Sequence, residues 1–152
     1  MSRIKHSASF EIPQAIDVLF PLFSAEGEKA WVPGWNYKNV MGRNDLHEDY
    51  VFVTTNHDHA SADAVWIVKE YDPSNYRVQF YKVEPGQKVG IIEVQCIAQG
   101  NSKAKVQVTY EYIGLSEKGN QFVSDFTTDD YQVFISEWQI LLLKYFEENA
   151  NK

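Results

Sequence analysis

The sequence predicts an α+β fold, in which a curved antiparallel sheet of about seven strands packs against one long helix at the C-terminus. Three observations support this prediction. Segments with alternating polar and apolar residues fill most of the chain up to residue 115, clusters of turn-forming residues separate them, and a long helical periodicity of apolar residues follows. A chain of 152 residues has the length of one domain, and we expect a single domain over residues 1–152.

The first strand is expected at residues 4–12, where every second residue faces one side of a sheet. Pro13 ends this strand, because proline has no amide hydrogen for a sheet ladder. The apolar residues then follow helical spacing up to Pro21, which breaks a first short helix and can begin a second one that ends near Ala30. Two short helices therefore follow the first strand.

Six further strands are expected between these short helices and residue 115. Clusters of Gly, Pro, Asn and Asp separate the segments, and connections this short favour antiparallel neighbours. The last two strands show the clearest apolar faces, with Cys96 on one of them and Tyr110 and Tyr112 on the other. The expected strands are 36–44, 49–57, 62–71, 75–83, 88–99 and 102–115.

A long amphipathic helix is expected to begin after Thr127 or Thr128 and to run to about Glu148. Either threonine can cap the helix, and two aspartates in its first turn suit the positive end of the helix dipole. This helix is the only element long enough to cover the concave face of a bent sheet, so we expect its apolar stripe to face the sheet. The stripe consists of Tyr131, Phe134, Ile135, Trp138, Leu142 and Tyr145.

Charge and composition exclude several classes of function. The formal net charge of −7 disfavours a nucleic-acid partner, because an acidic protein repels the phosphate backbone. The single cysteine, Cys96, cannot form an internal disulfide, which fits a cytoplasmic location. No apolar run has the length of a membrane span, and the N-terminus lacks the apolar core of a signal peptide. We therefore expect a cytoplasmic protein.

Three motifs carry a resemblance to a known family: "LFSAEGEKAWVPGWN" at Leu22 to Asn36, "YDP" at Tyr71 to Pro73, and "VTYEYIGLSEKGN" at Val108 to Asn120. With the order of the elements, they resemble the START-like superfamily, also called SRPBCC. This superfamily includes polyketide cyclases and dehydratases, lipid-transfer domains and pollen-allergen-type ligand binders. The resemblance implies a helix-grip fold with a cavity between the sheet and the C-terminal helix. It implies no single activity, because the superfamily hosts many.

Aromatic side chains are the candidate ligand-binding residues, and they make up 14% of the sequence. A ligand pocket needs mostly apolar walls with a few polar groups that orient the guest, and the hydroxyls of Tyr110 and Tyr112 are suitable polar groups. The alternative is that these side chains only fill the core. The candidates are Trp31, Trp35, Trp66, Phe80, Tyr110, Tyr112, Phe134 and Trp138.

Other polar residues are expected to have structural roles. Residues 57–59, His-Asp-His, are the only cluster of metal-ligand types, but they lack the three or four ligands at a recognised spacing that zinc requires. We interpret them as a polar loop and expect no metal. His6 is interpreted as a hydrogen-bonded core histidine, Cys96 as a small buried hydrophobe, and Glu26–Glu28 as solvated surface.

Three functions agree with the sequence. The first is the binding or carrying of a small hydrophobic ligand, which we favour because no catalytic cluster is recognisable and no cofactor motif is present. The second is a cyclase- or dehydratase-type enzyme that uses Tyr or His proton donors. The third is a protein-interaction module that presents surface aromatics such as Trp31 and Trp35. Catalytic residues, ligand and oligomeric state are not predicted.

Overall fold

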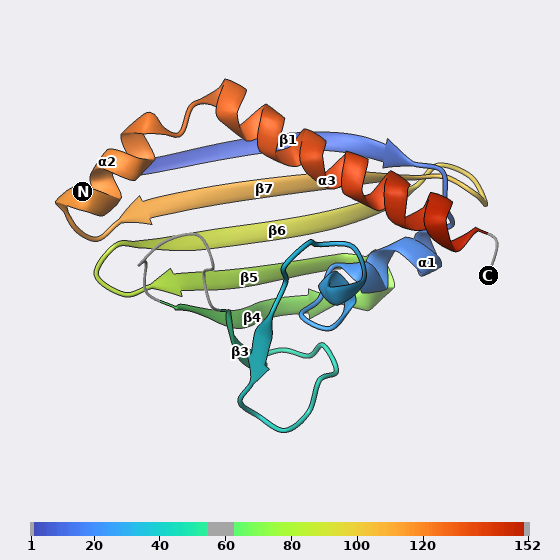
Figure 1. The fold of residues 1–152 in the computed structure, drawn as a ribbon, viewed down its shortest axis with the longest axis horizontal. Coiled ribbons are helices and arrows are strands. Elements are labelled where there is room, and N and C mark those ends of the chain that lie inside the picture. The colour runs from blue at the N-terminus through green and yellow to red at the C-terminus, as the bar shows by residue number, and fades with distance from the viewer. Residues whose placement is uncertain (1, 55–62, 151–152) are drawn as a thin grey trace.

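A curved antiparallel sheet of seven strands is the main element of the computed structural model, which describes residues 2–54 and 63–150 (Figure 1). Neighbouring strands are consecutive in sequence, except that β1 pairs with β7. The spatial order is β1-β7-β6-β5-β4-β3-β2. The strands are β1 (Arg3–Ile12), β2 (Tyr37–Asn39), β3 (Val51–Thr54), β4 (Ala64–Asp72), β5 (Arg77–Glu84), β6 (Lys88–Ala98) and β7 (Ala104–Gly114).

The region between β1 and β2 contains three short helical elements: α1 (Ile16–Leu19) and the 3-10 turns η1 (Phe20–Leu22) and η2 (Gly27–Ala30). The first helix ends at Leu19, just before Pro21, which lies in the first turn of η1, where its missing amide hydrogen is tolerated. The second helix expected from Pro21 to near Ala30 is instead two separate 3-10 turns, η1 and η2. A further 3-10 turn, η3 (Pro73–Asn75), joins β4 to β5. These elements close one side of the concave face of the sheet (Figure 1).

Two helices follow the sheet, α2 (Glu117–Asp125) and α3 (Thr128–Asn149). Thr127 caps α3 through a reciprocal pair of hydrogen bonds with Asp130. The Asp130 amide donates to Thr127 Oγ1 at 3.1 Å, and the Thr127 amide donates to Asp130 Oδ2 at 3.3 Å. The predicted helix start is therefore confirmed, and α3 ends one residue beyond the predicted Glu148.

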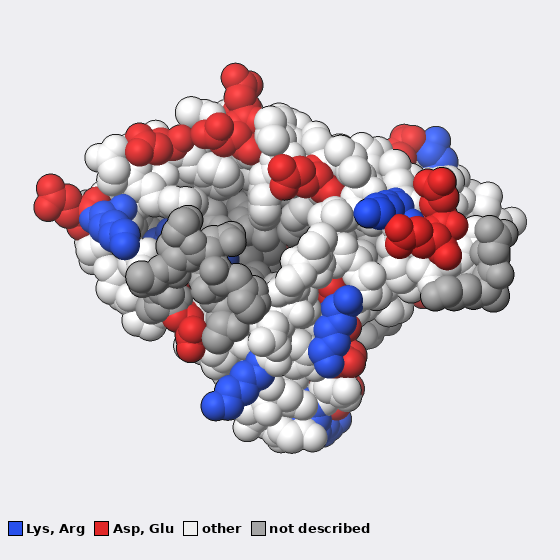
Figure 2. Space-filling model, viewed as in Figure 1, with Lys and Arg blue, Asp and Glu red and all other residues white. Residues whose placement is uncertain are grey.

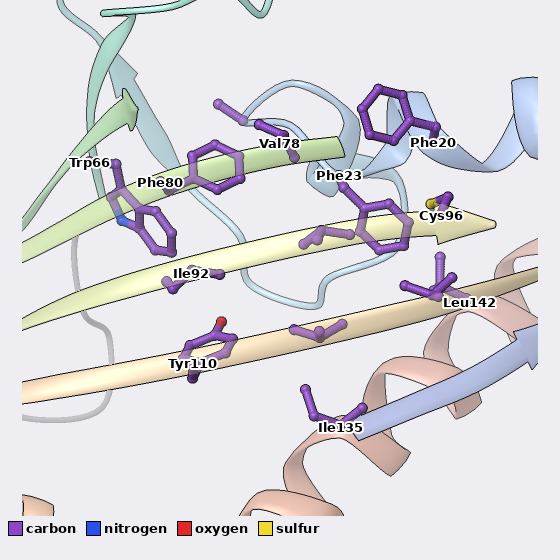
Figure 3. Packing of buried hydrophobic residues seen from close by; sticks show 14 of the residues in the cluster. Phe20, Phe23, Trp66, Val78, Phe80, Ile92, Cys96, Tyr110, Ile135 and Leu142 are labelled. Carbon is purple, nitrogen blue, oxygen red and sulfur yellow. The ribbon is translucent and has the colours of Figure 1, made fainter. Parts of the chain in front are cut away.

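The apolar stripe of α3 packs on the concave face of the sheet, as predicted. Ile135 and Leu142 are at most 2% exposed and lie against the inward residues of β6 and β7 (Figure 3). Tyr131 is also fully buried, and its hydroxyl donates to the carbonyl of Val108 at 2.6 Å. Full burial of such a side chain contributes roughly 1.5–3 kcal/mol, so this contact holds α3 onto the sheet.

Two further sequence predictions agree with the structure. The Phe126 carbonyl accepts a hydrogen bond from His6 Nε2 at 2.8 Å, and the His6 ring stacks on Tyr131 with centroids 5.3 Å apart. His6 is thus a satisfied histidine that joins β1 to the α2–α3 junction. Cys96 is buried, and burial raises the pKa of its thiol to about 12, so it is an apolar packing group rather than a nucleophile. Among the described residues, no helix is long and apolar enough to cross a membrane.

Candidate functional site

A small internal space lies between the sheet and α3, and we call it the central void. Its volume is about 20 Å³, which holds about one water molecule. Large aromatic side chains from the sheet and from the region after β1 fill most of the interior around it, with Trp66 and Phe80 facing Tyr110 across Ile92 (Figure 3). The void is lined by Phe23, Glu28, Phe52, Trp66, Phe80, Ile92, Val94, Tyr110 and Trp138.

A second, larger space opens to solvent, and we call it the mouth pocket. Its volume is about 230 Å³. Trp66 lines both the mouth pocket and the central void, so its indole separates the two. The Trp66 indole N–H donates to Thr54 Oγ1 at 2.9 Å, and Trp35 contacts Trp66 edge to face. The mouth pocket is lined by Val32, Pro33, Gly34, Trp35, Asn36, Thr54, Ala64, Trp66, Lys82 and Glu84.

A third space, the helix groove, lies on the α3 side and has a volume of about 440 Å³. Trp138 lines both the groove and the central void, and it contacts Trp31 with ring centroids 5.6 Å apart. Figure 2 shows that the surface is hollowed on the face that carries α3 and the loop after η2. The groove is lined by Trp31, Val32, Pro33, Phe134, Glu137, Trp138, Ile140 and Leu141.

Seven of the eight predicted aromatic residues line at least one of these three spaces. The exception is Tyr112, whose ring packs edge to face on Phe122 and lies 5.6 Å from the Nζ atom of Lys88. Contact of these aromatic residues with a ligand stays a prediction. The interpretation of Trp31 as a surface aromatic is wrong, because it is 5% exposed and its indole N–H donates to the carbonyl of Leu22.

Glu28 is a site residue that the sequence interpretation missed. The prediction that Glu26–Glu28 is solvated surface holds for Glu26, which is exposed, but is wrong for Glu28, whose carboxyl lines the central void. Residues three apart share a face of a 3-10 turn, so Glu28 points inward with the buried Trp31. Glu28 lies three residues before Trp31, and this spacing was the sequence signal that could have identified it as an inward residue.

Burial raises the pKa of the Glu28 carboxyl to about 8, and the positive charge of Lys82 offsets only part of this effect. Within the described part of the chain, the Glu28 side chain makes no hydrogen bond. At neutral pH the group is therefore mainly protonated and can donate its hydrogen to a guest. Tyr110 adds a second hydroxyl to the same void, and burial raises its pKa well above the usual value, so it also stays protonated.

Three charged residues share the inward face at one end of the sheet. Glu84 and Lys88 are each 7% exposed, and Lys88 Nζ lies 3.0 Å from Glu84 Oε2. This contact is an ion pair without hydrogen-bond geometry, so Oε2 has no hydrogen-bond partner among the described residues. Lys82 Nζ lies 5.3 Å from the centroid of the Trp66 ring, and burial lowers the pKa of this amine. Every second residue of a strand faces the same side of the sheet, so the inward residues Val78 and Phe80 could have predicted that Lys82 and Glu84 also face inward.

No group of three potential metal ligands occurs in residues 2–54 and 63–150. Residues 57–59, which the sequence analysis interpreted as a polar loop, lie outside the described residues.

Solved structures of similar fold were found at low sequence identity. A variant of norcoclaurine synthase from Thalictrum flavum, in complex with a transition-state analogue, is 10% identical with a TM-score of 0.70, over 98% of this chain and 97% of that chain. Ara h 8.0201 is 13% identical with a TM-score of 0.66, over 97% of both chains. An aromatase/cyclase from Streptomyces sp. R1128 is 10% identical with a TM-score of 0.63, over 99% and 94%. No protein-family model matches the sequence, and a search of curated proteins found no match.

The sheet order, the long C-terminal helix and these similarities define the class of protein by its fold. It is a helix-grip protein, in which a curved antiparallel sheet surrounds a C-terminal helix. More particularly, the chain has the fold of the START-like superfamily, so the resemblance predicted from the sequence is confirmed at the level of the fold.

Proposed function

We propose that this protein binds a small hydrophobic molecule between the sheet and α3, with entry through the mouth pocket. One observation carries the proposal: the Glu28 carboxyl faces a void lined by aromatic and aliphatic side chains, and no described residue hydrogen-bonds to it. Glu28 is partly buried, and a carboxyl without a partner among the described residues, set in a mostly apolar wall, can orient a guest in a ligand pocket.

Binding requires side chains to move. The central void holds about one water molecule, whereas the mouth pocket and the helix groove are each more than ten times larger. Trp66 and Trp138 separate these spaces from the void, so rotation of either indole would join two of them. We therefore expect a ligand to occupy the mouth pocket first and to reach Glu28 when Trp66 turns.

Titration with the neutral apolar fluorophore N-phenyl-naphthylamine tests the proposal. We expect saturable binding to the folded protein, and we expect Asn36→Trp to weaken it by about tenfold, because the new side chain obstructs an apolar pocket wall. Asn101→Trp is the matched control, since Asn101 is exposed in the β6–β7 connection and lines none of the three spaces. Binding that does not saturate, or equal binding by both variants, would contradict a site in the mouth pocket.

A second candidate function is an enzyme of the cyclase or dehydratase type. The observation that favours it is the pKa of Glu28, because a general acid works best with a pKa near the working pH. Glu28 would donate a proton to a guest oxygen, and the Tyr110 hydroxyl would donate a hydrogen bond. Native mass spectrometry of ligand copurified with wild type and with Glu28→Gln distinguishes the two functions. A carrier retains the same ligand mass in both, whereas an enzyme accumulates a different compound in the variant.

A further inference from the structure

We propose that the ligand carries an anionic oxygen, as in an apolar carboxylic acid, and that Lys82 binds this group at the mouth pocket. This inference rests on the proposed binding function and names the chemical class of the ligand. It follows from three features of the pocket: the placement of Lys82, the neutral state of Glu28 and the pairing of Glu84.

Lys82 is a cation in a largely apolar setting, where Glu84 and Glu28 attract it but no described carboxylate forms an ion pair with it. It lines the mouth pocket, its Nζ lies over the Trp66 ring, and within residues 2–54 and 63–150 it forms no ion pair. An amine this enclosed loses hydration, which is consistent with its lowered pKa. A ligand carboxylate beside Nζ would replace the lost hydration with a charge-assisted hydrogen bond.

The two carboxyl groups near Lys82 are not available as its counter-ion. Glu84 already pairs with Lys88 at 3.0 Å, and Lys88 lies 3.9 Å from the Phe122 ring centroid, which keeps that pair together at the end of the sheet. Glu28 is attracted by Lys82 but forms no ion pair with it. Glu28 is mostly protonated at neutral pH and therefore nearly uncharged. The four side chains Lys82, Lys88, Glu84 and Glu28 together carry about one net positive charge.

A cationic ligand fits this pocket poorly. It would lie beside Lys82 and would need Glu28 to ionise in an apolar void, which burial disfavours. The protein surface is acidic overall, with a formal net charge of −7. Salt screens charges beyond a Debye length of about 8 Å, so the groups inside the pocket decide the affinity.

The affinity for an acid should also depend on pH. The titratable groups that face Lys82 in the described structure are Glu84 on β5, Lys88 on β6 and Glu28 from η2. As the pH rises through about 8, Glu28 gains a negative charge that repels an anion. Burial lowers the pKa of Lys82, which favours loss of its positive charge and acts in the same direction. The acid should therefore bind more weakly at pH 9 than at pH 7, while a neutral ligand should be unaffected.

Displacement of bound N-phenyl-naphthylamine by three compounds with the same chain tests the inference: decanoate, decanol and decylamine. We expect decanoate to displace the fluorophore at a concentration roughly tenfold below that of decanol, because a charged hydrogen bond is worth about that factor. Decylamine should be the weakest competitor. Decanoate should lose affinity between pH 7 and pH 9, and Glu28→Gln should reduce that loss.

Lys82→Met should bring the affinity for decanoate down to that for decanol, once each displacement is corrected for the affinity of the variant for the fluorophore, which a direct titration measures. Lys69→Met is the matched control, since Lys69 Nζ lies 5.2 Å over the Tyr81 ring, a cation–π contact like that of Lys82, but Lys69 is exposed and lines none of the three spaces. This control should keep the preference for decanoate.

The outcomes separate the two proposals. Saturable fluorophore binding with equal displacement by decanoate and decanol, or with a preference for decylamine, overturns the anionic ligand and keeps the hydrophobic site. A preference for decanoate that survives Lys82→Met overturns the role of Lys82. Absence of saturable fluorophore binding to the folded protein overturns the proposed function itself.

Discussion

The two ends of the concave face of the sheet differ, although the same strands build both. At one end, β5, β6 and β7 present Val78, Val94 and Val106, which are at most 2% exposed, and α3 packs Leu142 against this end. At the other end, β5 and β6 present Lys82, Glu84 and Lys88 on the same face. The first end buries apolar surface and stabilises the fold. The second buries charge, which stabilises little. Its residues are those to which we assign ligand binding in our proposal.

Leu142→Ala should have the largest effect on stability, because it opens a cavity at the apolar end. Leu142 is 0% exposed, and truncation of a buried leucine costs about 3–4 kcal/mol in the free energy of unfolding. Urea denaturation measures this loss. Leu143→Ala, at a neighbouring position that is 39% exposed, should cost less than about 1 kcal/mol. Equal losses for the two variants would mean that α3 does not pack through the stripe that contains Leu142.

Lys88→Met should cost about 3 kcal/mol, because it leaves the buried Glu84 carboxyl without its counter-ion. The double variant Glu84→Leu/Lys88→Met should recover most of this loss, since an apolar pair of similar volume has no charge to desolvate. Urea denaturation of the two single variants and the double variant gives the coupling energy. A double variant as unstable as Lys88→Met would show that the charged end contributes to stability as the apolar end does.

Glu28→Gln should stabilise the protein by about 2 kcal/mol at pH 8 and have little effect at pH 5. The pKa of about 8 in the folded protein lies above the ordinary glutamate value of 4.5, so the stability contribution of Glu28 is fully present below pH 4.5 and is lost as the pH rises to about 8. For a fully buried group, the free energy of unfolding would change by about 1.4 kcal/mol per pH unit between the two pKa values. Glu28 is partly exposed to solvent, which reduces this change.

Thermal unfolding as a function of pH measures this effect. Glu26→Gln is the control, because Glu26 is exposed, and hydrogen bonding by Tyr37 and then Lys29 lowers the pKa of its carboxyl instead. A Glu28→Gln variant whose stability parallels that of wild type from pH 5 to pH 9 would show that the Glu28 carboxyl is hydrated rather than buried.

The fold was largely predictable from the sequence because its signals are local. Alternation predicted the strands, and the Thr127 cap and the apolar stripe through Ile135 and Leu142 predicted α3. The strand limits were less predictable: the segment expected at 36–44 is the three-residue β2, and the described pairing with β3 covers only these three residues.

The charged residues of the candidate site were not predicted. Glu28, Lys82 and Glu84 have the composition of surface residues, and average burial statistics favour solvent for each of them. The spacing of Glu28 from a tryptophan and strand alternation pointed inward, but these weak signals were outweighed by residue type. The structure shows that Glu28 turns inward from η2 and that Lys82 and Glu84 lie on the concave face. The aromatic residues were easier to select, because most large aromatic side chains in the described part of this chain are buried or pack against the core.

Of the substitutions at buried or partly buried positions, Lys82→Met should change stability least. It is compared with Lys69→Met, because Lys69 is an exposed lysine that also lies over an aromatic ring. Burial lowers the pKa of Lys82, so charging this amine opposes folding at neutral pH, and its removal should raise the free energy of unfolding at pH 7. The gain should shrink toward pH 10.5, the ordinary pKa of lysine, where the unfolded chain loses its proton as well. Lys69→Met should change stability by less than about 0.5 kcal/mol at either pH. If Lys82→Met instead destabilises the protein, the amine has a stabilising partner, and its charge would then serve the fold rather than a ligand.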